Sequence, residues 1–598
     1  MRSAAVVLVF ALSHAITAQT PTFFHNVRVF DGERALPARD VLVQDGKIAR
    51  IGTGLTAPPN ATVIDGAGKT LLPGLIDAHT HAWGDALTTA LAFGVTTELE
   101  MFGDTSAARD RRAEQRTGRA SSRADLLSAG TLVTVKGGHG TEYGSTIPTL
   151  TSPRDAQAFV DARIGEGSDY VKIVYDDGQT YGSTWPTLTP EMLHATVAAA
   201  HARGKLALVH IGALSGARTA IDAGADGLAH LFVDHAPEPD FGTLIASHHA
   251  FVVPTLTVLK SITGVGGAAP LADDPRFSAY LTRQEVLMMK QAFPRGPGMP
   301  AVDYAFAEAA VKQLRAAHVP ILAGTDAGNP GTAHGAALHR ELELLVNAGL
   351  TPTEALAAAT SIPAKTFHLG DRGRIADGMR ADLLLISGDP TSDITATRDI
   401  AGVWKQGVAF DRARLAASVT AEVVAQGQAP AGSESGLVSD FDDGTTTTRF
   451  GSGWSISNDA MAGGKSTAEM IVVEGGAEGS AKSLAVRGTI SDAFKQAWAG
   501  AMFSPGRQVF QPANLGAKKE IRFWAKGDGK TYRVFVFAQS KGFTPLTQPF
   551  VADAAWKEYV FPLATFNGID GHDIMAVIFG GGPSPGSFAF QIDHVSFR

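Results

Sequence analysis

The stretch LLPGLIDAHTHAWG, residues 71–84, places two histidines one residue apart at the end of an apolar run. Because side chains alternate along a strand, His79 and His81 point to the same side if this run is extended. Two imidazoles side by side favour a metal site, and a coincidental pair on a polar face is the alternative. These two residues alone leave that choice open.

The composition indicates a globular protein of two or three domains. The chain has 598 residues, of which 44% are hydrophobic and 18% charged, and that length is too great for a single core. The formal net charge of -8, with no long basic run, argues against nucleic acid as a partner. Cysteine is absent, so the chain forms no disulfide and offers no thiolate as metal ligand or nucleophile.

Residues 1–18 are typical of a secretory signal peptide. Arg2 precedes a short apolar run, and small residues around Ala15 and Ala18 offer a cleavage site. A membrane anchor is the alternative, but the run is shorter than the roughly 20 apolar residues that a span needs. We therefore expect a mature chain without a membrane span, exported to the periplasm or the extracellular medium.

Short β segments flank a long middle region. Residues 19–72 include VLVQDGKIARIG, whose alternating pattern turns at Asp45-Gly46, a dipeptide suited to a hairpin. Residues 371–415 contain the similar pieces GRIADGMRADLLLISGDP and GVWKQGVAF. Neither segment is long enough for a domain of its own, so we predict that they pair into one small β-sandwich.

Residues 73–370 alternate short apolar strands with helical stretches. One helix is expected to begin at Thr189-Pro190, and another opens with a capping box from Thr351 to Glu354. The eight strand candidates are LLPGLIDAHTH, GVTTELEMF, TLVTV, YVKIVYD, LALVHI, GLAHLF, FVVPTLTV and VPILAGTDAG. Eight strands with intervening helices predict an α/β fold, a (β/α)8 TIM barrel, whose active site lies at the C-terminal ends of its strands.

The composition changes after residue 415. Residues 416–436, which include the small and polar run AEVVAQGQAPAGSESG, are predicted to be a linker. Residues 437–598 combine glycines, aromatic residues and alternating strands, a pattern typical of an all-β sandwich. Four tryptophans there either stack on a sugar or belong to the core: Trp454, Trp498, Trp524 and Trp556.

Polar side chains interrupt or close several predicted strands of the middle region. Lys172 lies within the apolar run YVKIVYD, where burial favours its neutral form. Strands five, six and eight end in His210, His230 and Asp326. A lone histidine at a strand end is more often structural than a ligand, but a barrel gathers its strand ends around one point. Together with the histidine pair quoted above, these groups predict a metal site.

At these residues the chain resembles the amidohydrolase superfamily. The two histidines of residues 79–81, the lysine of strand four, the histidines of strands five and six and the aspartate of strand eight follow its binuclear pattern in order. The pieces NVRVFDG and GRIADGMRADLLLISGDP look like its flanking sandwich, so the resemblance covers about residues 23–410. The segment HGAALHRELELLVNAGLTPTEALAAAT is similar to the imidazolonepropionase-like and prolidase-like branch. GVTTELEMFGD departs from the GVTTVRD of relatives, so no substrate preference is transferred through that strand.

The resemblance implies two divalent metal ions and a role for each residue. One ion is held by His79, His81 and Asp326 and the other by His210 and His230, while Lys172 carries a carbamate that bridges both. A hydroxide between the ions would attack a carbonyl, and Asp326 would act as general base and pass the proton to the leaving nitrogen. Zinc suits imidazole and carboxylate ligands, and manganese, cobalt and iron are alternatives.

Four further residues are weaker candidates. His139, in KGGHGTEYG, matches a position that touches substrate in this branch, and an ordinary loop histidine is the equal alternative. Tyr143 lies in the same loop. His334 would reach the rim of the site, whereas His339 is expected to pack on a helix.

Residues 437–598 resemble the galactose-binding-like jelly roll of the complex I intermediate-associated type, through a diffuse pattern from DFDDG to FQIDHVSFR. We expect a secreted metal-dependent hydrolase of a small-molecule amide, such as a dipeptide, an N-acyl amino acid or a cyclic amide. An esterase or lactonase would use the same site. The rival class is a non-catalytic protein, in which a degenerate barrel supports a carbohydrate-binding sandwich. The complete ligand set argues against that reading, because a degenerate site would be free to lose ligands.

Overall fold

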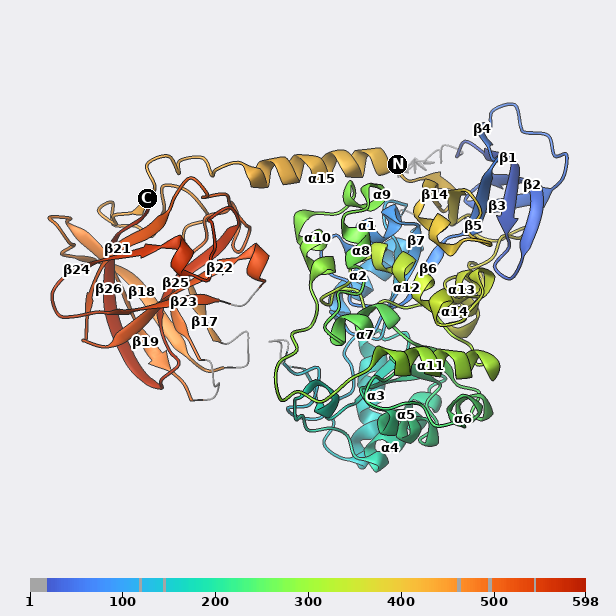
Figure 1. Cartoon of the computed structure of the whole chain (residues 1–598), viewed down its shortest axis with the longest axis horizontal. Coiled ribbons are helices and arrows are strands. Elements are labelled where there is room, and N and C mark those ends of the chain that lie inside the picture. The colour runs from blue at the N-terminus through green and yellow to red at the C-terminus, as the bar shows by residue number, and fades with distance from the viewer. Residues whose placement is uncertain (1–18, 118–120, 143–146, 460–463, 493–496, 543–544) are drawn as a thin grey trace, which may run out of the picture.

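The computed structural model describes residues 19–117, 121–142, 147–459, 464–492, 497–542 and 545–598. The expected signal peptide and Tyr143 lie outside these ranges. A mixed α/β body and an all-β body are joined by helix α15, Arg412–Gly427 (Figure 1). Within the described residues, no helix has the length and apolar character that a bilayer crossing requires.

The two flanking β segments share one sheet. The sheet runs in the order β15-β14-β13-β5-β1-β2-β3, with β4 beside β1. Its strands are β1 Thr22–Phe30, β2 Ala35–Gln44, β3 Lys47–Gly52, β4 Thr62–Asp65, β5 Lys69–Pro73, β13 Leu383–Ser387, β14 Ile400–Lys405 and β15 Val408–Ala409. Strand β5 pairs antiparallel with β13, with Leu72 opposite Leu384. The segments before and after the middle region thus meet in the centre of this sheet.

Seven parallel strands and a set of helices form the middle region. One sheet has the order β6-β7-β8 and the other β12-β11-β10-β9. The strands are β6 Leu75–Thr80, β7 Val95–Glu100, β8 Asp125–Ser128, β9 Val171–Tyr175, β10 Ala207–Ile211, β11 Gly227–Ala229 and β12 Phe251–Val253. The helices are α1 Ala86–Ala92, α2 Thr105–Arg116, α3 Ala156–Glu166, α4 Pro190–His201, α5 Leu214–Asp222, α6 Phe241–Ser247, α7 Leu256–Ile262, α8 Ala269–Ala272, α9 Pro275–Ser278, α10 Arg283–Lys290, α11 Tyr304–Ala316, α12 Ala336–Asn347, α13 Pro352–Ala358 and α14 Ser361–Thr366. Both predicted helix starts are confirmed: Thr189 caps α4, and α13 begins with the Thr351–Glu354 capping box.

Backbone bridges connect the two parallel sheets. Val133 bridges Ile173 of β9, Ile321 bridges Val252 of β12, and Ala327 bridges Thr80 of β6. The segment 319–328 therefore lies between β12 and β6 and hydrogen-bonds to both. Its carboxyl end is consequently held beside the end of β6.

Two strand predictions were wrong in detail. The third strand is β8, not the later run TLVTV, because Gly130 turns the chain at φ 62° and leaves Val133 a single bridge. The predicted eighth strand, VPILAGTDAG, forms isolated bridges only, at Ile321 and Ala327, and Asp326 between them adopts a left-handed φ of 57°. Apolar β-branched character alone does not distinguish such bridging segments from regular strands.

The segment predicted as a linker is largely helical. Helix α15 includes residues 412–427, and Asp411 caps it by accepting a hydrogen bond from the Arg414 amide at 2.9 Å. Alanine, which is frequent in this run, is the strongest helix former. The small residues that indicated flexibility therefore favour a regular helix between the two bodies.

A buried ion cluster ties the middle region to the flanking sheet. Asp125 of β8 accepts hydrogen bonds from Arg372 and Arg380, each at 2.6 Å, and lies 3.0 Å from the Lys405 ammonium. Lys405 also contacts Asp382 at 2.9 Å. Burial would raise the pKa of Asp125, but the three cations outweigh it and hold that pKa well below the ordinary value.

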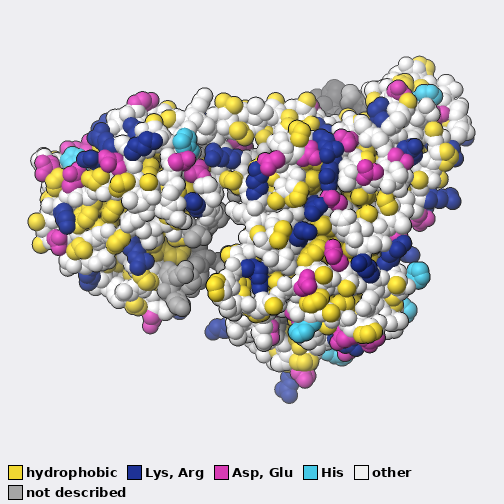
Figure 2. All heavy atoms as spheres, in the orientation of Figure 1, with side chains coloured by type: hydrophobic (Ala, Val, Ile, Leu, Met, Phe, Trp, Pro, Cys, Tyr) yellow, Lys and Arg dark blue, Asp and Glu magenta, His cyan; other side chains and the backbone are white. Residues whose placement is uncertain are grey.

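The C-terminal body is a pair of antiparallel sheets. One has the order β18-β19-β26-β21-β24 with β16 beside β26, and the other β17-β20-β25-β22-β23. The strands are β16 Leu437–Ser439, β17 Trp454–Asn458, β18 Thr467–Glu474, β19 Lys482–Ile490, β20 Ala499–Phe503, β21 Glu520–Gly527, β22 Thr531–Ala538, β23 Leu546–Val551, β24 Lys557–Pro562, β25 Ile574–Gly581 and β26 Gly586–Phe597. On the face shown in Figure 2, lysine and arginine side chains are interspersed with acidic ones over both bodies.

Candidate metal centre and active site

Five of the predicted site residues lie at or just beyond neighbouring strand ends, and a sixth, Lys172, lies within its strand. His79 is in β6 and His81 follows it, Lys172 is in β9, His210 is in β10, His230 follows β11, and Asp326 lies in the bridging segment 319–328. Parallel strands present their carboxyl ends at one edge of a sheet, which is where these side chains meet. Residues that are far apart in the sequence are therefore brought together at this edge.

Short distances join four of these side chains. The Asp326 Oδ1 atom lies 3.1 Å from His81 Nε2 and 3.4 Å from His79 Nε2. The Lys172 Nζ atom lies 3.3 Å from His79 Nε2. Within the described residues, the ligand atoms of His79, His230 and Asp326 come within 4.8 Å of one another, close enough to hold one metal ion.

His210 extends the cluster from the His230 side. The His79 and His230 rings are 4.6 Å apart between centroids, and the His230 and His210 rings are separated by the same 4.6 Å. The four histidine rings and the carboxylate thus form one continuous group with the lysine beneath it. Its extent is compatible with more than one ion.

Three histidines are oriented by hydrogen bonds to the nitrogen that faces away from the cluster. His81 Nδ1 donates to the Phe102 carbonyl at 3.0 Å, and His210 Nε2 donates to Asp176 at 3.1 Å. The Thr255 hydroxyl donates to the Pro254 carbonyl, so His230 Nδ1 donates to that hydroxyl oxygen at 2.7 Å. Each bond assigns the tautomer and leaves the second ring nitrogen with a free lone pair, the form that binds metal.

Burial keeps these groups in their ligand forms. Desolvation lowers the pKa of His210 to about 4 and the pKa values of His79 and His230 well below the ordinary range. Burial alone would raise the pKa of Asp326, but the neighbouring His79 and His81 outweigh it and hold that pKa well below its usual value. These pKa directions favour the neutral imidazole for His79, His210 and His230 and the ionised carboxylate for Asp326.

Lys172 has a pKa far below that of an ordinary lysine. Its side chain is buried, and desolvation lowers its pKa to about 7, with the charge of Asp326 opposing the shift. A substantial fraction of the amine is therefore neutral near pH 7 and carries a lone pair.

The donor set fits a divalent metal ion. The buried Oδ1 of Asp326 and Nδ1 of His79 have no hydrogen-bond partner within the described residues. Buried polar atoms without partners are unfavourable and indicate a missing ligand. Imidazole nitrogens with a carboxylate suit zinc, and also manganese, cobalt or iron.

The weaker histidine candidates have different outcomes. His139 stacks on Trp185 with centroids 4.8 Å apart and lies 4.9 Å from the His210 ring, so it borders the cluster. His334 is buried, and its Nδ1 lies 2.9 Å from Glu98. His339 is buried in α12 and donates from Nε2 to the Phe93 carbonyl at 2.9 Å, which confirms the expected packing role.

Sequence reasoning missed the partners of these histidines. Asp176 lies four residues after Lys172, so strand alternation places both on one side, and this signal was present in YVKIVYD. Glu98 and Glu100 alternate in the same way along the buried strand β7. Thr255 carried no comparable signal, because it follows β12 in a left-handed conformation with φ 52°.

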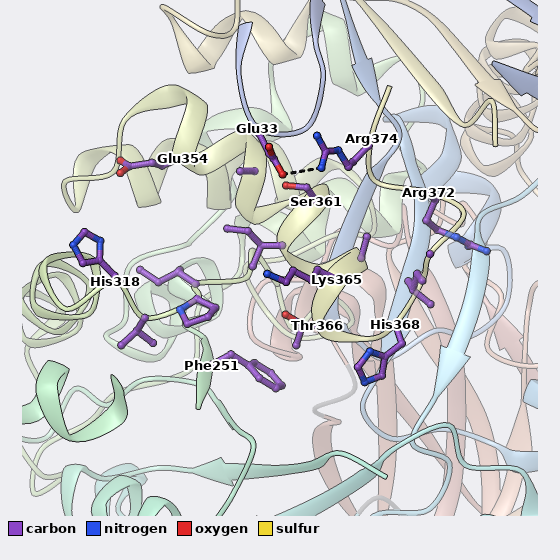
Figure 3. Close-up of a pocket in the computed structure, with 18 of the residues that line it drawn as sticks. Glu33, Phe251, His318, Glu354, Ser361, Lys365, Thr366, His368, Arg372 and Arg374 are labelled. Atoms are coloured by element: carbon purple, nitrogen blue, oxygen red, sulfur yellow. Dashed lines mark hydrogen bonds and ion pairs between the residues drawn. The ribbon is translucent and has the colours of Figure 1, made fainter. Parts of the chain in front are cut away.

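Two cavities lie at opposite ends of the parallel strands. One of about 750 Å³ borders His81 at the carboxyl ends. The other, of about 1130 Å³, is shown in Figure 3 and borders Phe251, the first residue of β12, at the amino ends. Ion pairs occupy its rim, such as Arg374–Glu33 at 2.8 Å and Arg315–Glu354 at 2.9 Å. The smaller cavity therefore borders the candidate metal site at His81.

The tryptophans of the C-terminal body are not equivalent. Trp454 is buried, packs near Phe441 and donates to the Ser439 hydroxyl at 3.0 Å, so it is a core residue and not a sugar platform. Trp556 is half-buried, with the Lys526 ammonium 4.7 Å from its ring centroid. Trp498 and Trp524 are also half-buried.

Residues 171–409 match the amidohydrolase family, and residues 440–572 match the complex I intermediate-associated protein 30 family. The chain is 28% identical over 421 residues to imidazolonepropionase of Cereibacter sphaeroides, covering 64% of this chain and 95% of that protein. It is 25% identical over 401 residues to imidazolonepropionase of Deinococcus radiodurans, covering 60% of this chain and 87% of that protein.

Solved structures show the same fold at lower identity. A Xaa-Pro dipeptidase with bound methionine superposes with a TM-score of 0.53 at 21% identity, covering 66% of this chain and 100% of that chain. Molinate hydrolase superposes with a TM-score of 0.53 at 20% identity, covering 67% of this chain and 97% of that chain. The chain therefore contains an amidohydrolase family domain, that of an enzyme acting on carbon–nitrogen bonds, followed by a complex I intermediate-associated protein 30 domain.

Proposed function

We propose that this protein hydrolyses the amide bond of a small molecule, such as a dipeptide, an N-acyl amino acid or a cyclic amide. The observation that carries the proposal is a cluster of four histidines, three of them oriented by hydrogen bonds to the outer nitrogen, around one carboxylate and one buried lysine. The names of the relatives, imidazolonepropionase and Xaa-Pro dipeptidase, support a cyclic amide or a dipeptide as substrate.

The fold that we propose is a (β/α)8 TIM barrel. Seven parallel strands in two sheets, with the segment 319–328 bridging β12 and β6 and Val133 bridging β9, support a closed ring. In such a barrel the carboxyl ends of the strands form the active site. The position of the histidine cluster agrees with that rule.

The residues proposed to hold two divalent ions, with zinc as the best-suited metal, are His79, His81, Lys172, His210, His230 and Asp326. When bound, such ions supply Lewis acidity toward a carbonyl oxygen and lower the pKa of a coordinated water. Phe102, Asp176 and Thr255 would keep three imidazoles turned toward the ions, through the hydrogen bonds described above.

Asp326 is proposed to move the proton. Its carboxylate is ionised and its Oδ1 has no hydrogen-bond partner within the described residues, so it can accept a proton from the attacking water. It would then return that proton to the leaving nitrogen as the carbon–nitrogen bond breaks. His139, which borders His210 beside Trp185, is proposed to contact the leaving group.

Lys172 is proposed to carry a carboxyl group derived from carbon dioxide. The neutral amine attacks carbon dioxide, a nitrogen–carbon bond forms, and one amine proton is released, leaving a carbamate anion. Its lowered pKa near 7 and its buried position 3.3 Å from His79 support this step. The carbamate would carry a negative charge, which the two proposed metal ions would attract. An ammonium group at the same position would be repelled by those ions.

Metal analysis with a substrate screen tests the proposed function. Purified protein should contain about two equivalents of a divalent metal, as the binuclear pattern requires, and should hydrolyse members of a panel of dipeptides, N-acyl amino acids, cyclic amides, esters and lactones. The Asp326→Asn protein is the matched control, because it keeps the shape of the side chain. Absence of both metal and turnover would overturn the proposal in favour of a non-catalytic protein. Export, predicted from residues 1–18, is tested separately by cell fractionation.

A further inference from the structure

Trp83 is an exposed aromatic residue beside the metal ligands. It lies two residues after His81 and exposes 62% of its surface. Its ring lies against the backbone of Gly328, where a Cβ atom would come within 2.4 Å of the indole. The ring also meets the buried His334 edge-on, with centroids 6.1 Å apart. The indole is thus held between the loop after β6 and the loop after Asp326.

A cavity of about 750 Å³ opens beside this indole. Its apolar lining includes Trp83, Leu87, Phe102, Leu126 and Ile147, and His81 borders it at the end toward the metal ligands. A volume of this size accepts a drug-sized group. An apolar cavity beside a predicted metal ligand suits the part of a substrate next to the reacting bond.

The charges around this cavity are unfavourable to a carboxylate. Glu100 and Asp104 both line it, and Glu100 accepts hydrogen bonds from the Ala82 amide at 3.2 Å and the Ser128 hydroxyl at 2.5 Å. Arg111, the cation of the lining, is paired with Glu114 at 3.4 Å. An amino-acid leaving group carries a carboxylate, so it fits poorly here, whereas an uncharged acyl group fits well.

We propose that Trp83 and this cavity form an acyl pocket that selects amides with a branched or aromatic apolar group on the carbonyl side. The inference rests on the proposed amide hydrolysis and names the substrate class of that site. The exposed indole covers one face of the acyl group and removes it from water when substrate binds. Leaving groups would extend toward His139 and Trp185, on the opposite side of the cluster.

Two substrate series test the proposal on the full-length, metal-loaded protein. The first varies the acyl group on a constant leaving group: acetylglycine, isovalerylglycine and benzoylglycine. The second varies the leaving amino acid on a constant benzoyl group. We expect the wild-type kcat/KM to rise by about tenfold or more from acetyl to benzoyl, as for a group that fills an apolar pocket.

Substitutions of Trp83 separate the acyl pocket from a structural role. Trp83→Ala should lower the benzoyl-to-acetyl ratio of kcat/KM by about tenfold or more and leave the preference among leaving groups unchanged. Trp83→Phe should keep most of the ratio. Ile471→Ala, in the C-terminal body, removes a side chain of similar exposure, 60%, and should change neither series. Metal content and melting temperature of each variant check that the fold is retained.

Any of three results would overturn the acyl pocket. The first is equal wild-type rates for acetyl and benzoyl substrates. The second is an unchanged benzoyl-to-acetyl ratio of kcat/KM in Trp83→Ala, and the third is a Trp83→Ala protein whose leaving-group preference changes instead of that ratio. Failure of the proposed function is distinguished by calorimetric titration with sodium phenylacetate and sodium acetate, which needs no turnover. A protein that hydrolyses no amide but binds phenylacetate, and loses that binding in Trp83→Ala, retains the pocket without the reaction. If phenylacetate binds no better than acetate, the pocket is wrong whatever the reaction.

Discussion

Replacing Thr255 by valine tests whether the hydrogen bonds behind the histidines prepare the site for metal. Thr255 is fully buried, and its hydroxyl accepts a hydrogen bond from His230 Nδ1 at 2.7 Å while donating to the Pro254 carbonyl at 2.8 Å. Valine has nearly the same shape and keeps the branched Cβ at the left-handed φ of 52°. The Pro254 carbonyl keeps a second partner, the Leu231 amide at 3.3 Å. The substitution therefore removes the hydrogen-bond acceptor of His230 and changes little else.

The expected loss of metal affinity follows from the His230 N–H group, which is left without a hydrogen-bond acceptor. A buried N–H that loses its acceptor costs about 1–3 kcal/mol. The proton can move to Nε2 instead, but that nitrogen then no longer offers a lone pair to metal. Either outcome weakens the metal-loaded state, and loss of such a partner lowers metal affinity by about 10–100-fold, which corresponds to about 1.4–2.8 kcal/mol.

Competition titration of zinc against a chromophoric chelator measures this affinity. Thr255→Ser is the matched control, because it keeps the hydroxyl and should bind zinc within a few-fold of wild type. Equal zinc affinity of the valine protein and wild type would refute the orientation of His230 through Thr255. An equal loss in the serine and valine proteins would instead attribute the effect to packing at this position, because the serine protein keeps the hydroxyl.

Lys172→Ala should abolish nearly all activity and lower metal content, and short carboxylic acids should restore part of it; full turnover with two metals retained would exclude a bridging role. Asp326→Asn should lower kcat by about 10²-fold or more with little change in KM; steady-state kinetics beside metal analysis check this, and a metal-replete enzyme with normal kcat would end the proton-transfer role. Burial lowers the pKa of His210 from 6.5 to about 4, so between these pH values the unfolded chain binds more protons than the folded chain. The free energy of unfolding of the metal-free protein, measured in urea, should therefore fall by up to about 3 kcal/mol as the pH falls from about 6.5 to about 4. Stability that rises toward pH 4 would show that His210 is not buried in its neutral form. Truncation after residue 430 should leave a folded enzyme active on small substrates, and a metal-loaded but inactive product would mean that the C-terminal domain completes the site.

The clustering of the candidate ligand side chains was predictable because strand ends have a simple geometry. An apolar run that terminates in histidine or aspartate places that side chain at one edge of a parallel sheet, whatever the exact length of the strand. Asp326 illustrates the point, since its segment forms only isolated bridges and yet its carboxylate lies 3.1 Å from His81.

Other features depended on information that local sequence does not contain. The run TLVTV and the shorter β8 have similar apolar character, and the turn at Gly130 decides which of them pairs along its length. Residues 412–427 contain both linker-like small residues and good helix formers, and the helix is favoured once Asp411 caps it. Thr255 contacts His230 from a left-handed backbone conformation, and the residue type threonine does not predict that conformation.

The ion cluster around Asp125 makes the interior of the hydrolase region depend on residues near the end of that region. The carboxylate belongs to β8, but its three cationic partners are residues 372, 380 and 405, about 250 or more positions later in the chain. Without those residues, closing β8 into the interior would bury an unneutralised charge, which is strongly unfavourable. The closed interior of the hydrolase region therefore depends on residues from its last sheet strands. A chain truncated before Lys405 is expected to lose part of this charge compensation and to close β8 less stably.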